Sequence, residues 1–324
     1  MLEKMTSTPP PEEDKVIRKW SDPSTAYGSK DFKEYWELLS QVQKHEALLM
    51  AEGQDIIRYV CRFFPPGKIL SQMNCLVIGC EFGTSTSAIA LAQTGMFGSI
   101  LITDIAPDLL QQQQAITDQA GMKDIIHYAK LNLNTDEIPH RIPWDLIFTS
   151  GTIHHIDRLE FLFQGINRAL AQDGLFVMKE YVGPARLQFT PRQVSLVNRI
   201  LDVLPDSVKT QRDGSVKRTC FQPSLAEIVA NDPSEAIRSH EILDYAYRIL
   251  KVLTCNNTGG TLLHPLLHAI AGNFEQNECS VHLLQLLILM EQILIEGGVI
   301  PSDYIFLIAT HSKERENLSG REQP

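Results

Sequence analysis

A glycine-bearing segment near residue 80 combines a tight turn with the start of a helix. Gly79 follows the apolar stretch 74–78, and Gly83 precedes a helical pattern over 85–93. Glycine at 79 allows a sharp bend and close approach of a ligand, and a helix start offers unpaired N–H groups. Asp104 ends the next apolar stretch, where a carboxylate can accept both hydroxyls of an adenosine ribose. Together they predict a nucleoside-type ligand; the alternative is that Asp104 only caps the following helix.

The spacing of the glycines decides which nucleoside is expected. A nicotinamide dinucleotide site has the spacing G-x-G-x-x-G, whereas this chain has G-x-x-x-G with Glu81 in the middle. A carboxylate there opposes a diphosphate but suits the cationic ammonium and sulfonium groups of S-adenosylmethionine (SAM). Asn132, after the third apolar stretch, is placed to hold an adenine amino group. SAM is therefore expected; a Rossmann-type NAD(P)-dependent oxidoreductase and a non-catalytic SAM-binding subunit are the alternatives.

Two histidines and a glutamate stand where proton transfer would occur in such a site. His154 and His155 follow the fourth apolar stretch, and Glu180 and Tyr181 follow the fifth. Ligands of an open parallel sheet bind beyond the carboxyl ends of its strands, and histidine suits proton transfer near neutral pH. We predict His155 as the base, with His154 second and Glu180 third. The alternatives are that a histidine packs on the cofactor or bonds a carbonyl, and that Glu180 binds an acceptor amine or pairs with Arg186.

These residues need a sheet that brings strand ends together. Short apolar stretches alternate with helical patterns, an order that builds a parallel sheet covered on both faces. The predicted helices are 85–93, 106–121 and 158–170, and an Asp173-Gly174 turn ends the last. The predicted strands are 74–78, 99–103, 125–130, 145–149, 175–179, 248–255 and 304–309. The chain is therefore expected to be an α/β protein with a Rossmann-like sheet.

The rest of the chain is expected to cover this core. Tyr35 and Trp36 lie in a helical pattern before the first strand that either closes over the cofactor as a lid or simply packs. The expected divisions are a disordered tail over 1–28, an N-terminal helical lid over 29–66, a SAM-binding core over 67–183, a cap insertion over 184–240, last strands with a helical insertion over 241–312, and a second disordered tail over 313–324.

Composition narrows the partners. The 324 residues carry a net charge of −10, which disfavours nucleic acid. The apolar run 283–295 is too short for a membrane span and predicts a buried core helix; the helix over 281–295 would cover the sheet or join a homodimer interface. The basic residues at 209, 212, 217 and 218 predict a solvated loop, the alternative being a site for an anionic acceptor or carrier.

No metal ion and no disulfide framework are expected. The six cysteines form no C-x-x-C pair, and the first residues are not those of a secretory signal. His264 and His268 are four residues apart but lack a third ligand, so they are expected to line the core or a pocket. Reduced thiols in a cytoplasmic protein are the prediction.

Residues 73–180 resemble the class I SAM-dependent methyltransferases. Val77–Gly83 is similar to their first motif, Asp104 to their ribose acid and Asn132 to their adenine contact. Leu170–Leu175 resembles their L-x-x-G-G turn, with Asp173 in place of the first glycine, and Glu81 departs from a common glycine. The stretches 180–189, 232–239 and 259–264 resemble a bacterial subfamily that tailors small molecules and natural products.

The resemblance implies a seven-stranded methyltransferase sheet with a helical N-terminal lid and inserted cap elements. It implies a SAM site made of Gly79, Cys80, Glu81, Gly83, Asp104, Ile105, Asn132, Leu133 and Ser150. It implies a substrate pocket made of Trp36, Tyr35, Tyr181, Arg186 and His264. The motifs of nucleobase-amine, cytosine-C5 and metal-dependent catechol methyltransferases are missing, so metal-independent methylation of an oxygen or nitrogen of a small molecule is expected.

Overall fold

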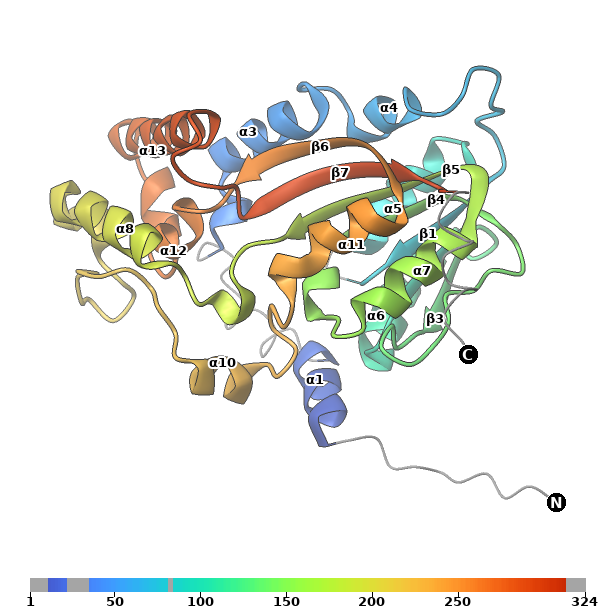
Figure 1. Cartoon of the computed structure of the whole chain (residues 1–324), viewed down its shortest axis with the longest axis horizontal. Helices are drawn as coiled ribbons and strands as arrows, with labels where there is room; N and C mark the ends of the chain where they lie inside the picture. Colours follow the sequence, from blue (N-terminus) through green and yellow to red (C-terminus); the bar gives the residue numbers. More distant parts are fainter. Residues whose placement is uncertain (1–10, 22–34, 81–83, 313–324) are drawn as a thin grey trace, which may run out of the picture.

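The computed structural model describes residues 11–21, 35–80 and 84–312 (Figure 1). Its strands are β1 (Met73–Ile78), β2 (Phe97–Asp104), β3 (Ile126–Lys130), β4 (Trp144–Ser150), β5 (Leu170–Tyr181), β6 (Lys251–Gly259) and β7 (Tyr304–Thr310). Its α-helices are α1 (Pro11–Ser21), α3 (Ser40–Ala51), α4 (Ile56–Cys61), α5 (Thr84–Gln93), α6 (Pro107–Gln119), α7 (Leu159–Ala169), α8 (Pro191–Val203), α9 (Asp206–Lys209), α10 (Leu225–Asn231), α11 (Ile242–Ile249), α12 (Leu263–Leu267) and α13 (Glu278–Glu296). Its 3₁₀ helices are η2 (Trp36–Leu38), η3 (Ile153–His155), η4 (Ala185–Leu187), η5 (Ser239–Glu241) and η6 (Ala271–Glu275).

The strands form one seven-stranded sheet in the order β3-β2-β1-β4-β5-β7-β6. Strands β1 to β5 are parallel to one another, while β7 pairs antiparallel with both β5 and β6. This confirms the predicted α/β sheet of seven strands. Because β1, β2, β3 and β4 are parallel, their carboxyl ends meet at one edge, where a ligand site is expected.

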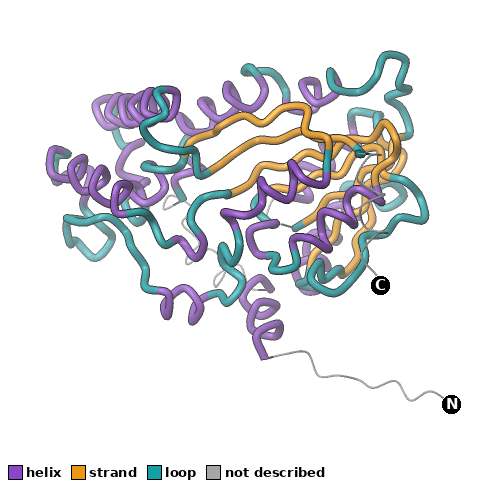
Figure 2. The backbone as a smooth tube through the Cα atoms, viewed as in Figure 1, coloured by secondary structure: helices purple, strands orange, loops and turns teal. Residues whose placement is uncertain are grey.

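Each face of the sheet is covered by helices, as the buried strands require. On one face α7 and α11, in front of the sheet in Figure 1, bury Phe163, Ile166 and Tyr245 against the strands. On the other face α3 to α6 contribute apolar side chains such as Tyr59 and Leu109. The cap and the C-terminal helices gather at one end of the molecule, away from the main run of strands (Figure 2).

Two strands, β5 and β6, differ from their predicted bounds by three residues or more at one or both ends. Strand β5 begins five residues before its predicted start and includes the predicted Asp173-Gly174 turn as a bulge, because Trp144 pairs with Leu170 and Leu146 pairs with Leu175. A Cβ on Gly174 would lie 2.5 Å from the Trp144 carbonyl oxygen and 3.0 Å from the Ala171 nitrogen, so glycine is needed where the bulge folds back against β4. Strand β6 begins three residues later than predicted, because Arg248 still belongs to the strongly amphipathic α11.

The predicted disordered tail over 1–28 is wrong for residues 11–21, which form α1. Lys15 Nζ donates a hydrogen bond to the Val229 carbonyl, and Lys19 Nζ lies 3.6 Å from Asp232 Oδ2. These contacts are made with the cap, more than 200 residues away. The composition of the segment indicates disorder, but tertiary contacts hold the helix.

The predicted solvated basic loop is also wrong for two of its members. Lys209 and Lys217 are buried. Lys217 Nζ donates to the carbonyl oxygens of Pro265, Leu266 and His268, while Arg218 is exposed and pairs with Asp206. The buried ammonium group of Lys217 therefore stabilises the turn after α12, and it does not face solvent where an anion could bind.

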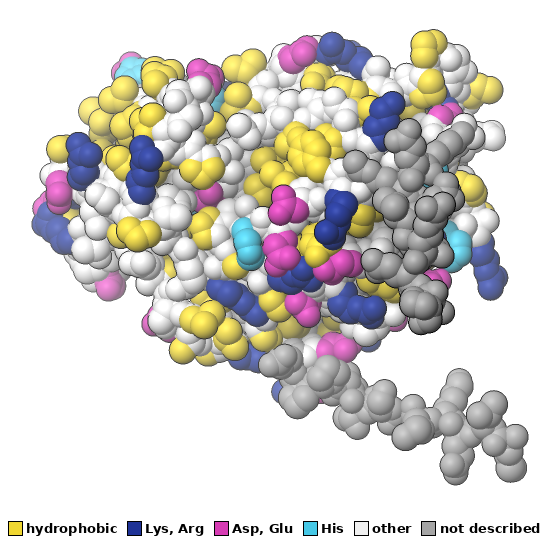
Figure 3. Space-filling view, viewed as in Figure 1, with side chains coloured by type: hydrophobic (Ala, Val, Ile, Leu, Met, Phe, Trp, Pro, Cys, Tyr) yellow, Lys and Arg dark blue, Asp and Glu magenta, His cyan; other side chains and the backbone are white. Residues whose placement is uncertain are grey.

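Helix α13 is a core helix on one face only. Leu284, Leu287 and Ile288 are buried, whereas Leu286, Leu289 and Ile293 are half or more exposed. Within the described residues it is the one helix long and apolar enough to cross a membrane by length and composition, and 28% of its apolar 18-residue stretch is buried. Hydrophobic side chains gather at the end of the molecule where α8 and α13 lie, and charges of both signs mix on the rest of this face (Figure 3).

Candidate active site

A cavity of about 510 Å³ opens at the carboxyl ends of the parallel strands. Six of the residues predicted to hold a cofactor line it: Gly79, Cys80, Asp104, Ile105, Asn132 and Leu133. Ser150 ends β4 but does not line the cavity; its neighbours Gly151 and Thr152 do. Glu81 and Gly83 lie outside the described residues. Cavities of this size are typical of sites for small ligands.

Glycine is required at 79 by both conformation and space. Its φ of +89° is strained for any residue with a side chain, and a Cβ there would lie 2.0 Å from Thr152 Oγ1. The hydroxyl of Thr152 in turn donates to the carbonyl of Ser150. The bend after β1 is therefore packed directly against the loop after β4, at the edge of the cavity.

Asp104 holds this bend as well as facing the cavity. Its Oδ2 accepts from the backbone N–H of Cys80 and its Oδ1 from that of Ala106, each at 2.8 Å. Burial raises the pKa of this carboxyl, and these N–H bonds oppose the shift. Each oxygen keeps a second lone pair, so the carboxylate fits two ribose hydroxyls. Asp104 is thus more than a helix cap.

Asn132 serves its own loop. The side-chain Oδ1 of Asn132 accepts from the backbone N–H of Asn134, and the backbone N–H of Asn132 donates to Asp136 Oδ2. Both Asn132 and Asn134 line the cavity, and Asn134 also holds the N–H groups of Asp157 and Arg158. The loops after β3 and η3 are therefore tied together at the cavity wall.

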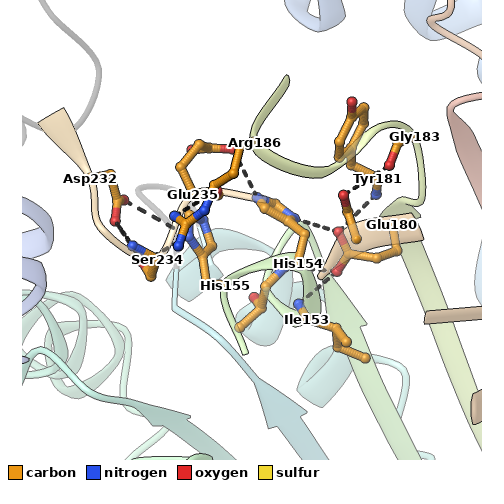
Figure 4. A network of polar contacts seen from close by, with 12 residues as sticks. Ile153, His154, His155, Glu180, Tyr181, Gly183, Arg186, Asp232, Ser234 and Glu235 are labelled. Carbon is orange, nitrogen blue, oxygen red and sulfur yellow. Dashed lines mark hydrogen bonds and ion pairs between the residues drawn. The ribbon is translucent and has the colours of Figure 1, made fainter. Parts of the chain in front are cut away.

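His155 lines the cavity and is held from behind. Its Nδ1 lies 3.1 Å from Ser234 Oγ, and that hydroxyl lies 2.6 Å from Asp232 Oδ1 (Figure 4). Asp232 Oδ1 also accepts the backbone N–H of Ser234, so it is an acceptor, and the Ser234 hydroxyl donates its one hydrogen to it. Ser234 Oγ must then accept from His155, which fixes the proton on Nδ1 and leaves Nε2 with its lone pair. Burial and the neighbouring His154 lower the pKa of His155.

His154 and Glu180 form a pair that does not line the cavity. His154 Nδ1 lies 2.5 Å from Glu180 Oε1, and Glu180 also accepts the backbone N–H groups of Thr152, Ile153 and Tyr181. Burial opposes the charge of both partners, but the attraction between them lowers the pKa of Glu180 and raises that of His154 to about 9. Glu180 therefore organises the loop that carries both histidines.

The residues predicted to form a substrate pocket lie elsewhere. Trp36, Tyr181 and His264 belong to a largely buried aromatic cluster with Tyr304, in which Trp36 stacks on His264. Tyr35 is 38% exposed. Arg186 donates to the carbonyls of Pro233 and Glu235 and does not pair with Glu180. None of the five lines this cavity.

Two groups of lining residues were missed from the sequence. Glu13, Val16 and Trp20 of α1 line the cavity, and the Trp20 ring meets His155 edge-on at 5.3 Å. No residue of the described part of the predicted lid, 35–66, lines the cavity, whereas these three residues of α1 do. Pro233, Ser234 and Ile237 also line the cavity; they stand in the resemblance stretch 232–239, the one signal that could have found them.

One protein family and a number of solved structures are similar to this chain. The model of a methyltransferase domain family matches residues 76–176. A geranyl diphosphate C-methyltransferase from Streptomyces coelicolor A3(2) is 13% identical, with 94% of this chain and 99% of that chain covered at a TM-score of 0.49. A SAM-dependent methyltransferase from Mesorhizobium loti is 12% identical, with 80% and 99% covered at a TM-score of 0.39. No curated protein matches the chain.

The family match spans the elements from β1 into β5 and therefore the sheet edge that bounds the cavity. The domain matched is not a nicotinamide-dependent oxidoreductase, so that alternative falls away. The cavity, its bend at Gly79 and its acid at Asp104 suit an adenosyl group. Residues 76–176 therefore match a methyltransferase domain, and the sheet and cavity that they form fit the use of SAM.

Proposed function

We propose that the enzyme methylates an oxygen or nitrogen of a small molecule, with natural-product tailoring as its setting and His155 as the base. Bound SAM supplies an activated methyl group, whose carbon bonds to the acceptor atom as its bond to sulfur breaks. Gly79, Cys80, Asp104, Ile105, Asn132 and Leu133 would hold the adenosyl part. The acceptor loses one proton in such a transfer, and the chain must supply a place for it.

The observation that carries the proposal is the fixed tautomer of His155. Because Ser234 and Asp232 hold the proton on Nδ1, the lone pair lies on Nε2, which no described residue bonds. The ring lines the same cavity as Asp104, so the donor and the base belong to one compartment. His154 is less suited, since its ring is engaged with Glu180 behind the cavity wall.

The limited cavity and the chain's negative charge support a small acceptor. Trp20 and Val16 of α1 close one side, and Pro233 and Ile237 of the cap form another. Apolar walls of this kind exclude water from the transfer. The resemblance of 180–189, 232–239 and 259–264 to small-molecule tailoring enzymes supports the same class of acceptor.

The test is the variant His155→Gln. Transfer of labelled methyl from SAM to a panel of hydroxyl and amine acceptors is measured beside calorimetric SAM binding. We expect turnover to fall by about 10²–10⁴-fold while SAM affinity changes little, because the base acts only on the acceptor. The matched control is His127→Gln, an exposed histidine on β3 outside the cavity lining. Wild-type turnover in His155→Gln would remove His155 as the base.

A further inference from the structure

Beside the cavity lies a three-residue group with the makings of a cation site. His154, His155 and Glu235 each offer one ligand atom, and these atoms all lie within 4.8 Å of one another. The histidines stand side by side on η3 with ring centroids 4.1 Å apart, and Glu235 comes from the cap (Figure 4). The two elements are 80 residues apart in sequence, so the fold alone brings the three side chains together.

The second nitrogens of both rings are already held. His154 Nδ1 bonds the Glu180 carboxylate, and His155 Nδ1 bonds Ser234 Oγ, with Asp232 Oδ2 at 3.8 Å. Metal-binding histidines characteristically have such an acceptor on the nitrogen that does not face the metal. In both rings Nε2 is thus the nitrogen left for a ligand, and His154 Nε2 lies 3.7 Å from Glu235 Oε1.

The charge around the group also favours a cation. Three carboxylates approach the histidines, from Glu180, Asp232 and Glu235, and Asp232 and Glu180 are almost completely buried. Lys19, 3.6 Å from Asp232, is the cation of α1 that faces them. Buried carboxylates are costly unless neutralised, and a divalent ion bound here would take over the positive charge that a proton on His154 and the ammonium of Lys19 otherwise supply.

We propose that His154, His155 and Glu235 bind one divalent transition-metal ion of the zinc class. Two imidazole nitrogens and one carboxylate oxygen suit Zn²⁺ or Co²⁺, whereas Mg²⁺ and Ca²⁺ prefer oxygen ligands. Metal–ligand bonds of about 2.0–2.2 Å require the ligand atoms to close to about 3.3 Å. Glu235 is the least buried of the three side chains, at 24% exposed, and rotates to make that approach.

Such an ion would regulate the transfer by inhibition. It would occupy the Nε2 lone pair of His155, the same lone pair that takes the acceptor proton in the proposed function. The inhibitory part of the inference rests on that proposal, whereas binding of the ion does not. Experiments can therefore reject the metal site and the proposed function independently.

The experiment uses the full chain stripped with a chelator and titrated with ZnCl₂ by calorimetry. CoCl₂ is titrated in parallel and followed by its visible spectrum. We expect one equivalent to bind, with a cobalt spectrum typical of four or five ligands. Glu235→Gln should weaken zinc binding at least 10-fold, while Glu137→Gln, at an exposed position outside the cavity lining, should not.

The outcomes separate the claims. Absence of zinc or cobalt binding, or equal affinity in Glu235→Gln, overturns the site. Zinc that binds but leaves methyl transfer unchanged, or speeds it, overturns the inhibition. If no acceptor is methylated under any condition but one zinc binds through Glu235, the site stands and the proposed function fails.

Discussion

At the scale of single residues, Asp104 has two tasks. It holds the bend after β1 through the N–H of Cys80 and the start of α6 through that of Ala106, and it faces the cavity. The sequence could predict the acid, because its place at the end of a strand is a local pattern. The sequence could not show that the same carboxylate also holds the bend after β1 in place through hydrogen bonds.

Asp104→Ala is expected to abolish SAM binding. Two charge-assisted hydrogen bonds to ribose hydroxyls, at about 1.5–3 kcal/mol each, correspond to a loss of roughly 10²–10⁴-fold in affinity. Calorimetry measures the dissociation constant. Asp108→Ala, an exposed acid in the first turn of α6, is the control and should bind SAM normally. An unchanged dissociation constant in Asp104→Ala would refute the ribose assignment.

At the scale of elements, local patterns predict the parts of the site and long-range contacts decide how they meet. Gly79 and His155 stand directly after apolar strands, so their place at this edge of the sheet is readable from sequence. Ser234 could not be assigned, because its partner is 79 residues away. Lys217 is predicted to be solvated because the three carbonyl groups that accept its hydrogen bonds lie about 50 residues later, and no local sequence pattern indicates them.

Helix α1 shows the same limit most clearly. Its polar composition and nearby prolines indicate a tail. The contacts that hold this helix are instead made with residues of the cap and with His155, which lie far away in sequence.

The proposed metal site could not be predicted from the sequence for a related reason. Two adjacent histidines and a glutamate 80 positions later match no known spacing of metal ligands.

Trp20→Ala tests whether α1 closes the site. Loss of the indole that meets His155 edge-on removes part of the cavity wall, and an aromatic contact of this kind contributes about 0.5–1.5 kcal/mol beyond its area. We expect SAM affinity to fall roughly 10-fold, read by calorimetry. Trp20→Phe keeps an aromatic edge and should stay within about 3-fold of wild type. If Trp20→Ala binds SAM as wild type does, α1 is not part of the binding site.

At the scale of the whole molecule, one buried acid ties the sheet to the cap. Asp303 is 1% exposed and precedes β7. Its Oδ2 accepts from Gln193 of α8, its N–H donates to Thr261, and its carbonyl accepts from Val182 at the end of β5. Burial raises the pKa of this carboxyl to about 7, helped by the charge of Glu291 and opposed by the hydrogen bond of Gln193.

This pKa predicts a stability that falls with rising pH. The folded chain holds the Asp303 proton more tightly than the unfolded chain, whose carboxyl has an ordinary pKa near 3.8. The resulting stabilisation is complete below that value and is lost as pH rises through about 7, because the unfolded state binds fewer protons in between. The free energy of unfolding of Asp303→Asn, which stays neutral, should lack this decline.

The measurement is chemical denaturation of both proteins at pH 5, 6, 7 and 8. Other groups titrate alike in the two chains, so the difference in the free energy of unfolding isolates Asp303. We expect the free energy of unfolding of the wild type to fall by about 2–3 kcal/mol relative to the variant between pH 5 and 8. Between the unfolded and the folded pKa, each rise of one pH unit costs about 1.4 kcal/mol. A difference that stays constant with pH would mean that Asp303 is ionised throughout. The joint between β7 and α8 would then rest on a charged hydrogen bond to Gln193, and the cap would not loosen from the sheet as pH rises.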